Sequence, residues 1–295
     1  MLSIKDKVYL RLSGGLGNQL FMYAASRRLS MVNNADLVID ISSGFASDPY
    51  MRKFELDSYP ISFIKPSFFV RFFIFSKPSR FFFRLAHYFF PSLNISYIES
   101  SLEYDSSLLN LTVSNFLYLE GYFQSYLYFN DISNEIRSTI KPSHIPLDYV
   151  SYLSTFTNKV SIAVHFRFFD PSLDSFNNLS IDYYSNAIAL LSHRFGKNIH
   201  FHIFSDTPDN VPLSLFDSFS YSFVSDCISA PSDTLDLWLM SQCSHFIIAN
   251  STFSWWGAWL SISPNKIVIA PHLEKLDGVS AWGFSGLIPD DWITL

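Results

Sequence analysis

Cysteine is almost absent from this chain of 295 residues, in which Cys227 and Cys243 are the only two. Two cysteines cannot build a disulfide framework or a four-thiolate zinc site, and their scarcity is typical of a reducing compartment. Charged residues make up only 16% and hydrophobic residues 48%, which excludes a disordered chain. The net charge of −6 argues against a general nucleic-acid binder, because such a protein needs a basic face to neutralise phosphates.

Long apolar runs are absent too, so the sequence predicts no membrane-spanning helix. The longest apolar region, Phe68 to Phe90, is interrupted by Pro78 and by four basic residues, among them Arg80 and Arg84. The interpretation that we favour is a pair of core helices with cationic outer faces. A segment lying in a membrane interface is the open alternative.

The first residues carry charges where a secretion signal has an apolar core, so we expect no such signal. The sequence therefore predicts a cytoplasmic protein. Peripheral contact with the inner face of the plasma membrane, through Phe68 to Phe90, belongs to the open alternative.

Glycine is sparse, with ten residues, yet three of them fall between Gly14 and Gly17. The apolar run Val8 to Leu12 predicts a buried strand before them, and the spacing from Leu20 to Val32 predicts a helix after them. Glycine at such a turn lets the backbone approach a ligand closely, and the amides of the helix N-terminus favour an anion. Asn18 and Gln19 at the helix entry indicate a polar ligand.

The same turn also fits a dinucleotide-binding protein. Gly15 and Gly17 match the first two glycines of that fingerprint, and Asp40 stands where a ribose-binding acid is expected. Leu20 replaces the third small residue. An oxidoreductase that uses a nicotinamide cofactor therefore stays an open alternative.

Strand-like and helix-like segments alternate along the chain, which predicts an α/β protein with parallel sheets. The predicted segments of the first half are Val8–Leu12, Leu20–Val32, Ala35–Ile41, Phe116–Gly121 and Tyr126–Ile140. Those of the second half are Val160–Phe166, Ile181–Phe195, Ile199–Phe204, Thr234–Cys243, His245–Ala249, Ser254–Ser261 and Lys266–Ala270. Two prolines between residues 141 and 146 predict a linker, so we expect domains at 1–145 and 146–295.

Polar side chains follow three predicted strands of the second half, where the carboxyl ends of parallel strands form a ligand-binding edge. His165 and Arg167 follow the first, Asp206 follows the second, and a run of amide and hydroxyl residues at 250–254 follows the third. An arginine fork can hold two phosphate oxygens, whereas a surface ion pair with Asp170 is the plainer alternative. Asp206 suits hydrogen bonds from a base or a ribose.

Two other groups of rings favour structural explanations. Trp255, Trp256 and Trp259 have helical spacing and predict a core more than a sugar platform. His200 and His202 share a strand face and could imitate a metal pair, but buried strand histidines fit better.

Seven motifs occur in the order seen in α-1,2-fucosyltransferases: GGLGNQLFMYAA, EGYFQS, VHFRFFD, FSD, LWLMSQCSHFI, NSTFSWWGAWL and IPDDW. The chain resembles, nearly end to end, the bacterial members that decorate surface polysaccharide. The resemblance implies two facing Rossmann-like domains of the GT-B class, with GDP-fucose on the C-terminal domain and the acceptor toward the N-terminal one. It implies inverting transfer of L-fucose to the 2-hydroxyl of a galactose-terminated glycan, free or lipid-linked, in O-antigen or other surface glycan synthesis.

The resemblance also assigns roles to residues. The implied donor site consists of His165, Arg167, Asp206, Asn250, Ser251 and Thr252 of the second domain with Gly15, Asn18 and Gln19 of the first. Arg167 would bind the β-phosphate, while Ser251 and Thr252 would hold phosphate oxygens at a helix N-terminus. Tyr122 and Gln124 would lie toward the acceptor.

The chemistry of the leaving group explains these assignments. Charge develops on the diphosphate as the sugar leaves, so positive groups and amides are needed at its oxygens. No two aspartates stand two residues apart, as an Asp-x-Asp metal motif requires, and we expect Arg167 and helix amides to act without a metal cofactor. Asp170 and Asp174 are candidates for the general base, and Asp170 is the tentative choice. Phe168 replaces the family's second arginine, which leaves a catalytically idle sugar-nucleotide binder as another alternative.

Overall fold

The computed structural model describes residues 5–169, 178–273 and 282–295. The chain divides into two compact units, one made of Met1–Lys141 with Phe284–Leu287 and the other of Pro142–Gly283 with Ile288–Leu295. Asp170 and Asp174, the candidates for the base, lie outside the described residues.

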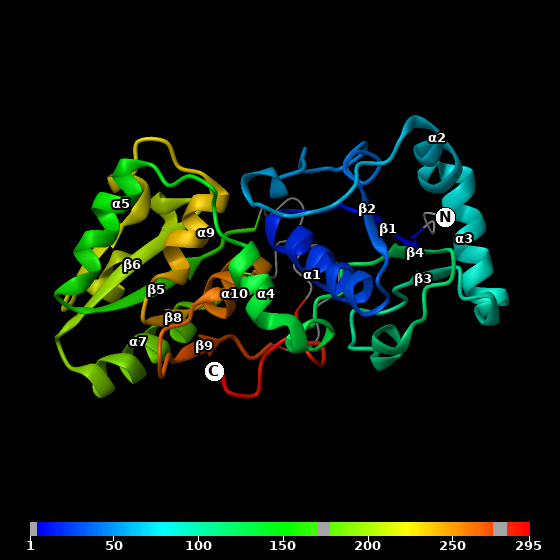
Figure 1. Cartoon of the computed structure of the whole chain (residues 1–295). Coiled ribbons are helices and arrows are strands. Elements are labelled where there is room, and N and C mark those ends of the chain that lie inside the picture. Colours follow the sequence, from blue (N-terminus) through cyan, green and yellow to red (C-terminus); the bar gives the residue numbers. More distant parts are fainter. Residues whose placement is uncertain (1–4, 170–177, 274–281) are drawn as a thin grey trace. The chain divides into compact units, whose positions relative to one another are not determined.

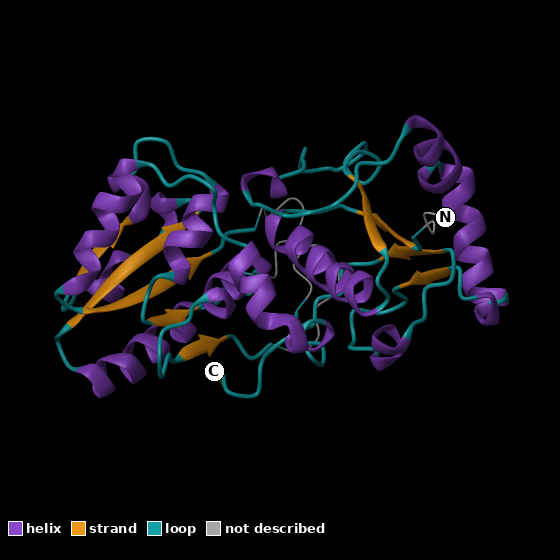
Figure 2. Ribbon diagram, viewed as in Figure 1, coloured by secondary structure: helices purple, strands orange, loops and turns teal. Residues whose placement is uncertain are grey.

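The first unit is built on a four-stranded parallel sheet with the order β2-β1-β4-β3 (Figures 1 and 2). Its strands are β1 Lys7–Arg11, β2 Asp36–Asp40, β3 Ser96–Ile98 and β4 Phe116–Glu120. Its α-helices are α1 Leu16–Val32, α2 Phe68–Val70, α3 Lys77–Phe89 and α4 Ser133–Thr139, and the π-helical turn η2 Arg71–Phe75 joins α2 to α3.

The second unit contains a six-stranded sheet with the order β10-β9-β8-β5-β6-β7, in which every pairing is parallel. Its strands are β5 Val160–Phe166, β6 Ile199–Ser205, β7 Ser220–Phe223, β8 His245–Ile247, β9 Val268–Ala270 and β10 Ile293–Thr294. Its described helices are α5 Leu147–Leu153, α7 Ile181–Phe195, α8 Val224–Cys227, α9 Asp233–Ser241 and α10 Thr252–Leu260. The α/β class with parallel sheets is thereby confirmed.

The central strands form because apolar and β-branched residues fill both faces of the sheet, as parallel strands covered by helices require. Ile162, Val164 and Phe201 have no exposed surface and pack with Leu191 of α7. The three tryptophans of α10 are also buried, as the sequence predicted. Trp255 contacts the ring of Trp292 at a centroid distance of 5.6 Å, which ties α10 to the end of the chain.

Two sequence predictions on elements were wrong. The single helix expected at Tyr126–Ile140 is two 3-10 turns, Tyr126–Tyr128 and Asn130–Ile132, followed by the short α4. Asn, Asp and Ser cluster there, and these residues favour caps and turns over helix interiors. Strand β7, whose residues are only partly buried, had no apolar signal from which to predict it.

The expectation of core helices with cationic outer faces on the Phe68 to Phe90 segment was only partly correct, because Arg71 and Lys77 are exposed. Arg80 and Arg84 of α3 form ion pairs with Glu120 at the end of β4, while most phenylalanines of the segment are exposed. A charge buried without its partner is costly, so Glu120 holds the cations on the inner side. Among the described residues, no helix combines the length and the apolar composition needed to cross a membrane.

Candidate active site

The polar residues predicted from the second half gather at one edge of the six-stranded sheet. Strands β8, β5 and β6 are neighbours and run parallel, so their carboxyl ends lie at the same edge. His165 and Arg167 lie at the end of β5, Asp206 follows β6, and residues 250–252 connect β8 to α10. The structure thus brings together side chains from three separate stretches of sequence.

Arg167 forms an ion pair with Asp206. Its Nη1 lies 2.5 Å from Oδ2 of Asp206, whose other oxygen accepts a hydrogen bond from the amide of Phe168 at 3.2 Å. The side chains of Arg167 and Asp206 are 33% and 31% exposed, so a ligand can reach both. Asp206 therefore orients the guanidinium of Arg167. The sequence had suggested Asp170 as the ion-pair partner of this arginine.

His165 presents a buried nitrogen to this edge. Its side chain is buried, and Nδ1 has no hydrogen-bond partner among the residues that the structure describes. Burial, assisted by the charge of Arg167, lowers the pKa of His165 to about 3, so the imidazole is neutral at neutral pH. The hydroxyl of Tyr184 donates to the carbonyl of His165 at 3.0 Å and fixes the backbone. Nδ1 is therefore buried with a hydrogen-bonding site that no described residue uses.

Helix α10 points its N-terminus at the same edge. The hydroxyl of Ser251 caps it by accepting a hydrogen bond from the amide of Phe253 at 3.3 Å. No acidic residue occupies the first turn, so no side chain there neutralises the positive end of the helix dipole. Together with Arg167, this end of α10 favours an anion such as a diphosphate.

In the first unit, the glycine turn and the segment after β4 meet. Gly14 has a φ of +79°, and a Cβ at that position would lie 3.0 Å from Nδ2 of Asn18 and 3.2 Å from the ring of Tyr122. Oδ1 of Asn18 accepts a hydrogen bond from Nε2 of Gln124 at 2.7 Å. The residues predicted for the donor and the acceptor in this unit therefore touch one another.

Gln19 holds the turn from inside. Its side chain is fully buried, and Nε2 donates to the carbonyls of Gly14 and Lys53, both at 2.8 Å. Its Oε1 accepts from the amide of Glu55 at 3.0 Å. These bonds give Gln19 a structural role, and its contact with a donor stays a prediction.

Arg52 is a candidate that the sequence did not reveal. Its guanidinium lies beside Gly15, 3.7 Å from the place of a Cβ on that glycine, and stacks over the ring of Tyr50 at 4.5 Å. Arg52 belongs to an irregular segment with no motif of its own, so only folding places this cation at the glycine turn.

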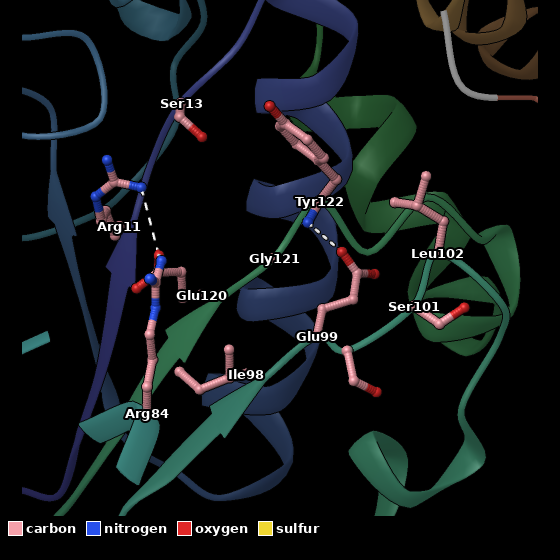
Figure 3. A pocket seen from close by; sticks show the side chains of 11 residues that line it. Arg11, Ser13, Arg84, Ile98, Glu99, Ser101, Leu102, Glu120, Gly121 and Tyr122 are labelled. Carbon is pink, nitrogen blue, oxygen red and sulfur yellow. Dashed lines mark hydrogen bonds and ion pairs between the residues drawn. The ribbon is translucent and has the colours of Figure 1, made fainter. Parts of the chain in front are cut away.

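A pocket of about 500 Å³ opens at the carboxyl ends of β1, β3 and β4 (Figure 3). Its lining residues are Arg11, Ser13, Arg84, Ile98, Glu99, Ser100, Ser101, Leu102, Glu120, Gly121 and Tyr122. Eight of these residues carry a hydroxyl, a carboxyl or a guanidinium group, and such groups suit the hydroxyls of a sugar. Tyr122, predicted to lie toward the acceptor, is part of it.

Two carboxyl groups of this pocket differ in character. Burial favours a higher pKa for Glu120, but hydrogen bonds from Tyr118 and Arg84 and the nearby cations hold that pKa below its usual value. One of these cations is Arg11, whose Nη1 lies 3.7 Å from Oε1 of Glu120. Glu120 is therefore an ionised, ion-paired group that fixes the arginines.

Glu99 behaves in the opposite way. Its Oε2 accepts a hydrogen bond from the amide of Tyr122 at 2.6 Å (Figure 3), and its Oε1 accepts one from the amide of Phe123 at 2.9 Å. Burial nevertheless raises the pKa of Glu99 to about 7. The carboxyl holds the Gly121 turn, where a Cβ would lie 2.4 Å from the Cβ of Glu99. A group with this pKa can take up and release a proton near neutrality.

The acid proposed for a nicotinamide site is used elsewhere. Asp40 is fully buried, and its oxygens accept hydrogen bonds from the amide and hydroxyl of Ser42 and from the amide of Ser43. It closes the turn after β2 and offers nothing to a ribose. This observation removes the main support for the oxidoreductase alternative.

The strand histidines are packed as predicted. His200 hydrogen-bonds to the hydroxyls of Ser220 and Ser222, and Nδ1 of the buried His202 lies 2.8 Å from the hydroxyl of Tyr152. Within the described ranges, no group of three His, Cys, Asp or Glu side chains is arranged to hold a metal ion.

Residues 71–277 match the model of glycosyl transferase family 11, and the chain belongs to that family. It is 31% identical to an α-1,2-colitosyltransferase of Escherichia coli over 279 residues, which cover 90% of this chain and 91% of that protein. It is 28% identical to the O-antigen biosynthesis glycosyltransferase WbnK of Escherichia coli, covering 98% and 100% of the two chains. The predicted resemblance to the bacterial α-1,2-fucosyltransferase family is thus confirmed at the level of the family.

Solved fucosyltransferases share the fold. Arabidopsis thaliana FUT1, solved as a mutant with GDP, aligns with a TM-score of 0.53 at 12% identity, over 92% of this chain and 71% of that one. The α-1,6-fucosyltransferase NodZ, soaked with GDP-fucose, aligns with a TM-score of 0.52 at 15% identity, over 90% and 95% of the two chains. These alignments confirm the GT-B-like fold class.

Proposed function

We propose that this glycosyltransferase moves L-fucose from GDP-fucose to the 2-hydroxyl of a terminal galactoside, with inversion, in the synthesis of O-antigen or another surface glycan. Membership of family 11 supports the reaction class. The observation that carries the donor assignment is the meeting of Arg167, Asp206 and the α10 N-terminus at one sheet edge. The Escherichia coli relative at 31% identity is a colitosyltransferase, which makes the donor sugar the main point to test.

In the proposed reaction, the acceptor oxygen bonds to the anomeric carbon while the bond from that carbon to the diphosphate oxygen breaks. GDP leaves with the electron pair, and the charge that develops on it meets the guanidinium of Arg167 and the amides of α10. His165 and Asp206 contact the guanosine, and Asn250, Ser251 and Thr252 complete the donor site. We assign the donor to residues 146–295 and the acceptor to residues 1–145.

The pocket at the ends of β1, β3 and β4 is our candidate for the acceptor subsite. Tyr122 lines it, and Gln124 is anchored beside it through Asn18. The proton of the acceptor hydroxyl must pass to a base, for which the sequence offered Asp170. Glu99 is a further candidate, because it lines this pocket and has a pKa of about 7.

We further propose that no metal ion takes part. Arg167 and the helix amides supply the positive charge that a divalent ion provides in enzymes with an Asp-x-Asp motif. A chelator should therefore leave the initial rate unchanged.

A donor-binding protein without turnover is the second candidate function. Phe168 occupies the position of the family's second arginine, and its ring packs against the apolar core of the second unit. One cation fewer at the diphosphate would weaken stabilisation of the leaving group. Such a protein would bind GDP-fucose without consuming it.

The test measures GDP release from GDP-fucose and from GDP-colitose with a panel of terminal β-galactosides, with and without EDTA, followed by linkage analysis of the product. Colitose is fucose without its 3-hydroxyl, so the pair isolates one donor contact. Acceptor-dependent release from GDP-fucose that survives EDTA and yields an α1,2 linkage is the expected result. Preference for GDP-colitose would overturn the fucosyl assignment, and binding without release would favour the idle binder.

A further inference from the structure

Two arginines of helix α3 reach a carboxylate at the end of a neighbouring strand. Arg80 and Arg84 reach Glu120 at the end of β4, and Nδ1 of His87 lies 3.2 Å from the carbonyl of Ser96 in β3. Surface helices of soluble proteins show the reverse, with cations in water and apolar residues inside. Glu120 favours this orientation, because the hydrogen bond and the charge of Arg84 help to keep its buried carboxyl ionised.

The opposite side of α2, η2 and α3 is lined with exposed rings. We call the exposed aromatic side chains between Phe68 and Phe90 the aromatic face. Its most exposed members include Phe68, Phe69, Phe81 and Tyr88, each with more than 60% of its surface accessible. An extensive exposed apolar surface of this kind marks an interaction site.

The segment beneath the aromatic face is firmly attached to the first unit. Phe75 and Phe83 are buried in a cluster with Tyr9 and Tyr118, and the rings of Phe83 and Tyr118 stack at a centroid distance of 4.7 Å. Figure 1 shows α3 at the β3 side of the sheet, with α2 at its N-terminal end. The exposed rings are therefore displayed on an anchored helix.

The charge around the aromatic face has one sign. No acidic residue occurs between Asp57 and Glu99, whereas that stretch contains five Lys and Arg residues. Arg71 and Lys77 are among them, and both are exposed. A second copy of this face would bring like charges together, while an anionic bilayer offers headgroups to the cations and an apolar interior to the rings.

We propose that the aromatic face of α2, η2 and α3 docks this protein on the interface of an anionic lipid bilayer. The rings enter the boundary between headgroups and acyl chains, and Arg71 and Lys77 contact the headgroups. The docking itself is independent of the sugar chemistry. Its purpose rests on the proposed function, since a lipid-linked acceptor would lie in the same membrane.

The test is sedimentation of the full chain with vesicles of phosphatidylcholine and phosphatidylglycerol at 7:3, and with phosphatidylcholine alone. The test variant replaces Phe69, Phe81 and Phe89 by Ser. The matched control replaces three exposed apolar residues outside the face, in the variant Met51→Ser, Leu147→Ser, Ile262→Ser. All six side chains are more than 60% exposed, so thermal unfolding should confirm intact folds in both variants.

We expect the wild type and the control to sediment with the anionic vesicles, and the aromatic variant to lose about a hundredfold in partition coefficient, at about fivefold per ring. A separate variant, Arg71→Gln with Lys77→Gln, should lose about fivefold per charge on anionic vesicles only.

Wild type that stays in the supernatant with both lipids would overturn the proposal, as would an equal loss in the control variant. A wild-type dimer that the aromatic variant dissociates, without vesicle binding, would identify a second copy as the occupant instead. GDP release with a free galactoside should be equal in all variants. Failure of that assay would count against the proposed function and leave the vesicle result to decide the docking.

Discussion

The substitution Glu99→Gln tests whether burial or hydrogen bonding controls the carboxyl under the Gly121 turn. The two amide bonds from Tyr122 and Phe123 favour the ionised form, and burial favours the neutral form. The balance raises the pKa of Glu99 from 4.5 to about 7. Gln is neutral at every pH, so it imitates the protonated acid.

The size of the effect follows from proton linkage. Between pH 4.5 and 7 the folded chain keeps a proton on Glu99 that the unfolded chain has released. The free energy of unfolding therefore decreases as pH rises, by at most about 1.4 kcal/mol per unit and by about 3 kcal/mol across the window. Above pH 7 the contribution is constant.

The assay is urea unfolding of the wild type and of Glu99→Gln at pH 5, 6, 7 and 8. Other groups titrate in this range, among them Asp236, whose pKa burial raises to about 6. The difference between the two proteins cancels their contributions. Relative to the wild type, the free energy of unfolding of Glu99→Gln should increase by about 3 kcal/mol as pH rises from 4.5 to 7. Asp57→Asn, which removes an exposed carboxyl of the same unit, is the matched control.

The reasoning is refuted if the difference in the free energy of unfolding between the wild type and Glu99→Gln stays constant between pH 5 and 8. The two amide bonds would then at least offset burial, and Glu99 would be a permanently ionised clamp. In that case it could not serve as a base near neutrality. If the rate of GDP release has a bell-shaped pH dependence and its decrease on the acid side persists in Glu99→Gln, Glu99 is likewise not the base.

Three further predictions concern the donor edge, the loss of stability in acid and the turn at Gly44. Arg167→Lys keeps the charge but loses the planar fork, so GDP release should fall by well over tenfold, while the exposed Arg194→Lys stays near wild type. Burial lowers the pKa of His202 from 6.5 to about 3. As pH falls, the unfolded chain therefore binds a proton at this imidazole before the folded chain does, and the free energy of unfolding decreases between pH 6.5 and 3. In His202→Phe the urea concentration at the unfolding midpoint should therefore decrease less as pH falls. An unchanged decrease would contradict the role of His202 in acid destabilisation. A Cβ on Gly44 would lie 1.8 Å from the carbonyl oxygen of Leu12. The substitution Gly44→Ala should therefore lower the free energy of unfolding by about 3 kcal/mol, which a reduced Tm would reveal. An unchanged Tm would show that the backbone at Gly44 can move away from Leu12.

The sequence by itself determined the strands and the polar residues at their ends. Apolar runs such as Val160–Phe166 and Ile199–Phe204 can only be buried strands of a parallel sheet, and the predicted bounds agree with β5 and β6 to within one residue. The glycine turn before α1 and the burial of the three tryptophans followed from local spacing in the same way. Periodicity is a local property, and these features need nothing more.

Only the tertiary structure decided which side chains meet. Arg167 pairs with Asp206, 39 positions away, because β5 and β6 are neighbours in the sheet. Arg84 turns inward because β4 ends in Glu120, which no helical pattern of α3 could reveal. The Gly121 turn likewise places amides on Glu99 and raises a question of protonation that the sequence does not pose. Pairing, burial and pKa depend on partners distant in sequence, and the order of the strands selects those partners.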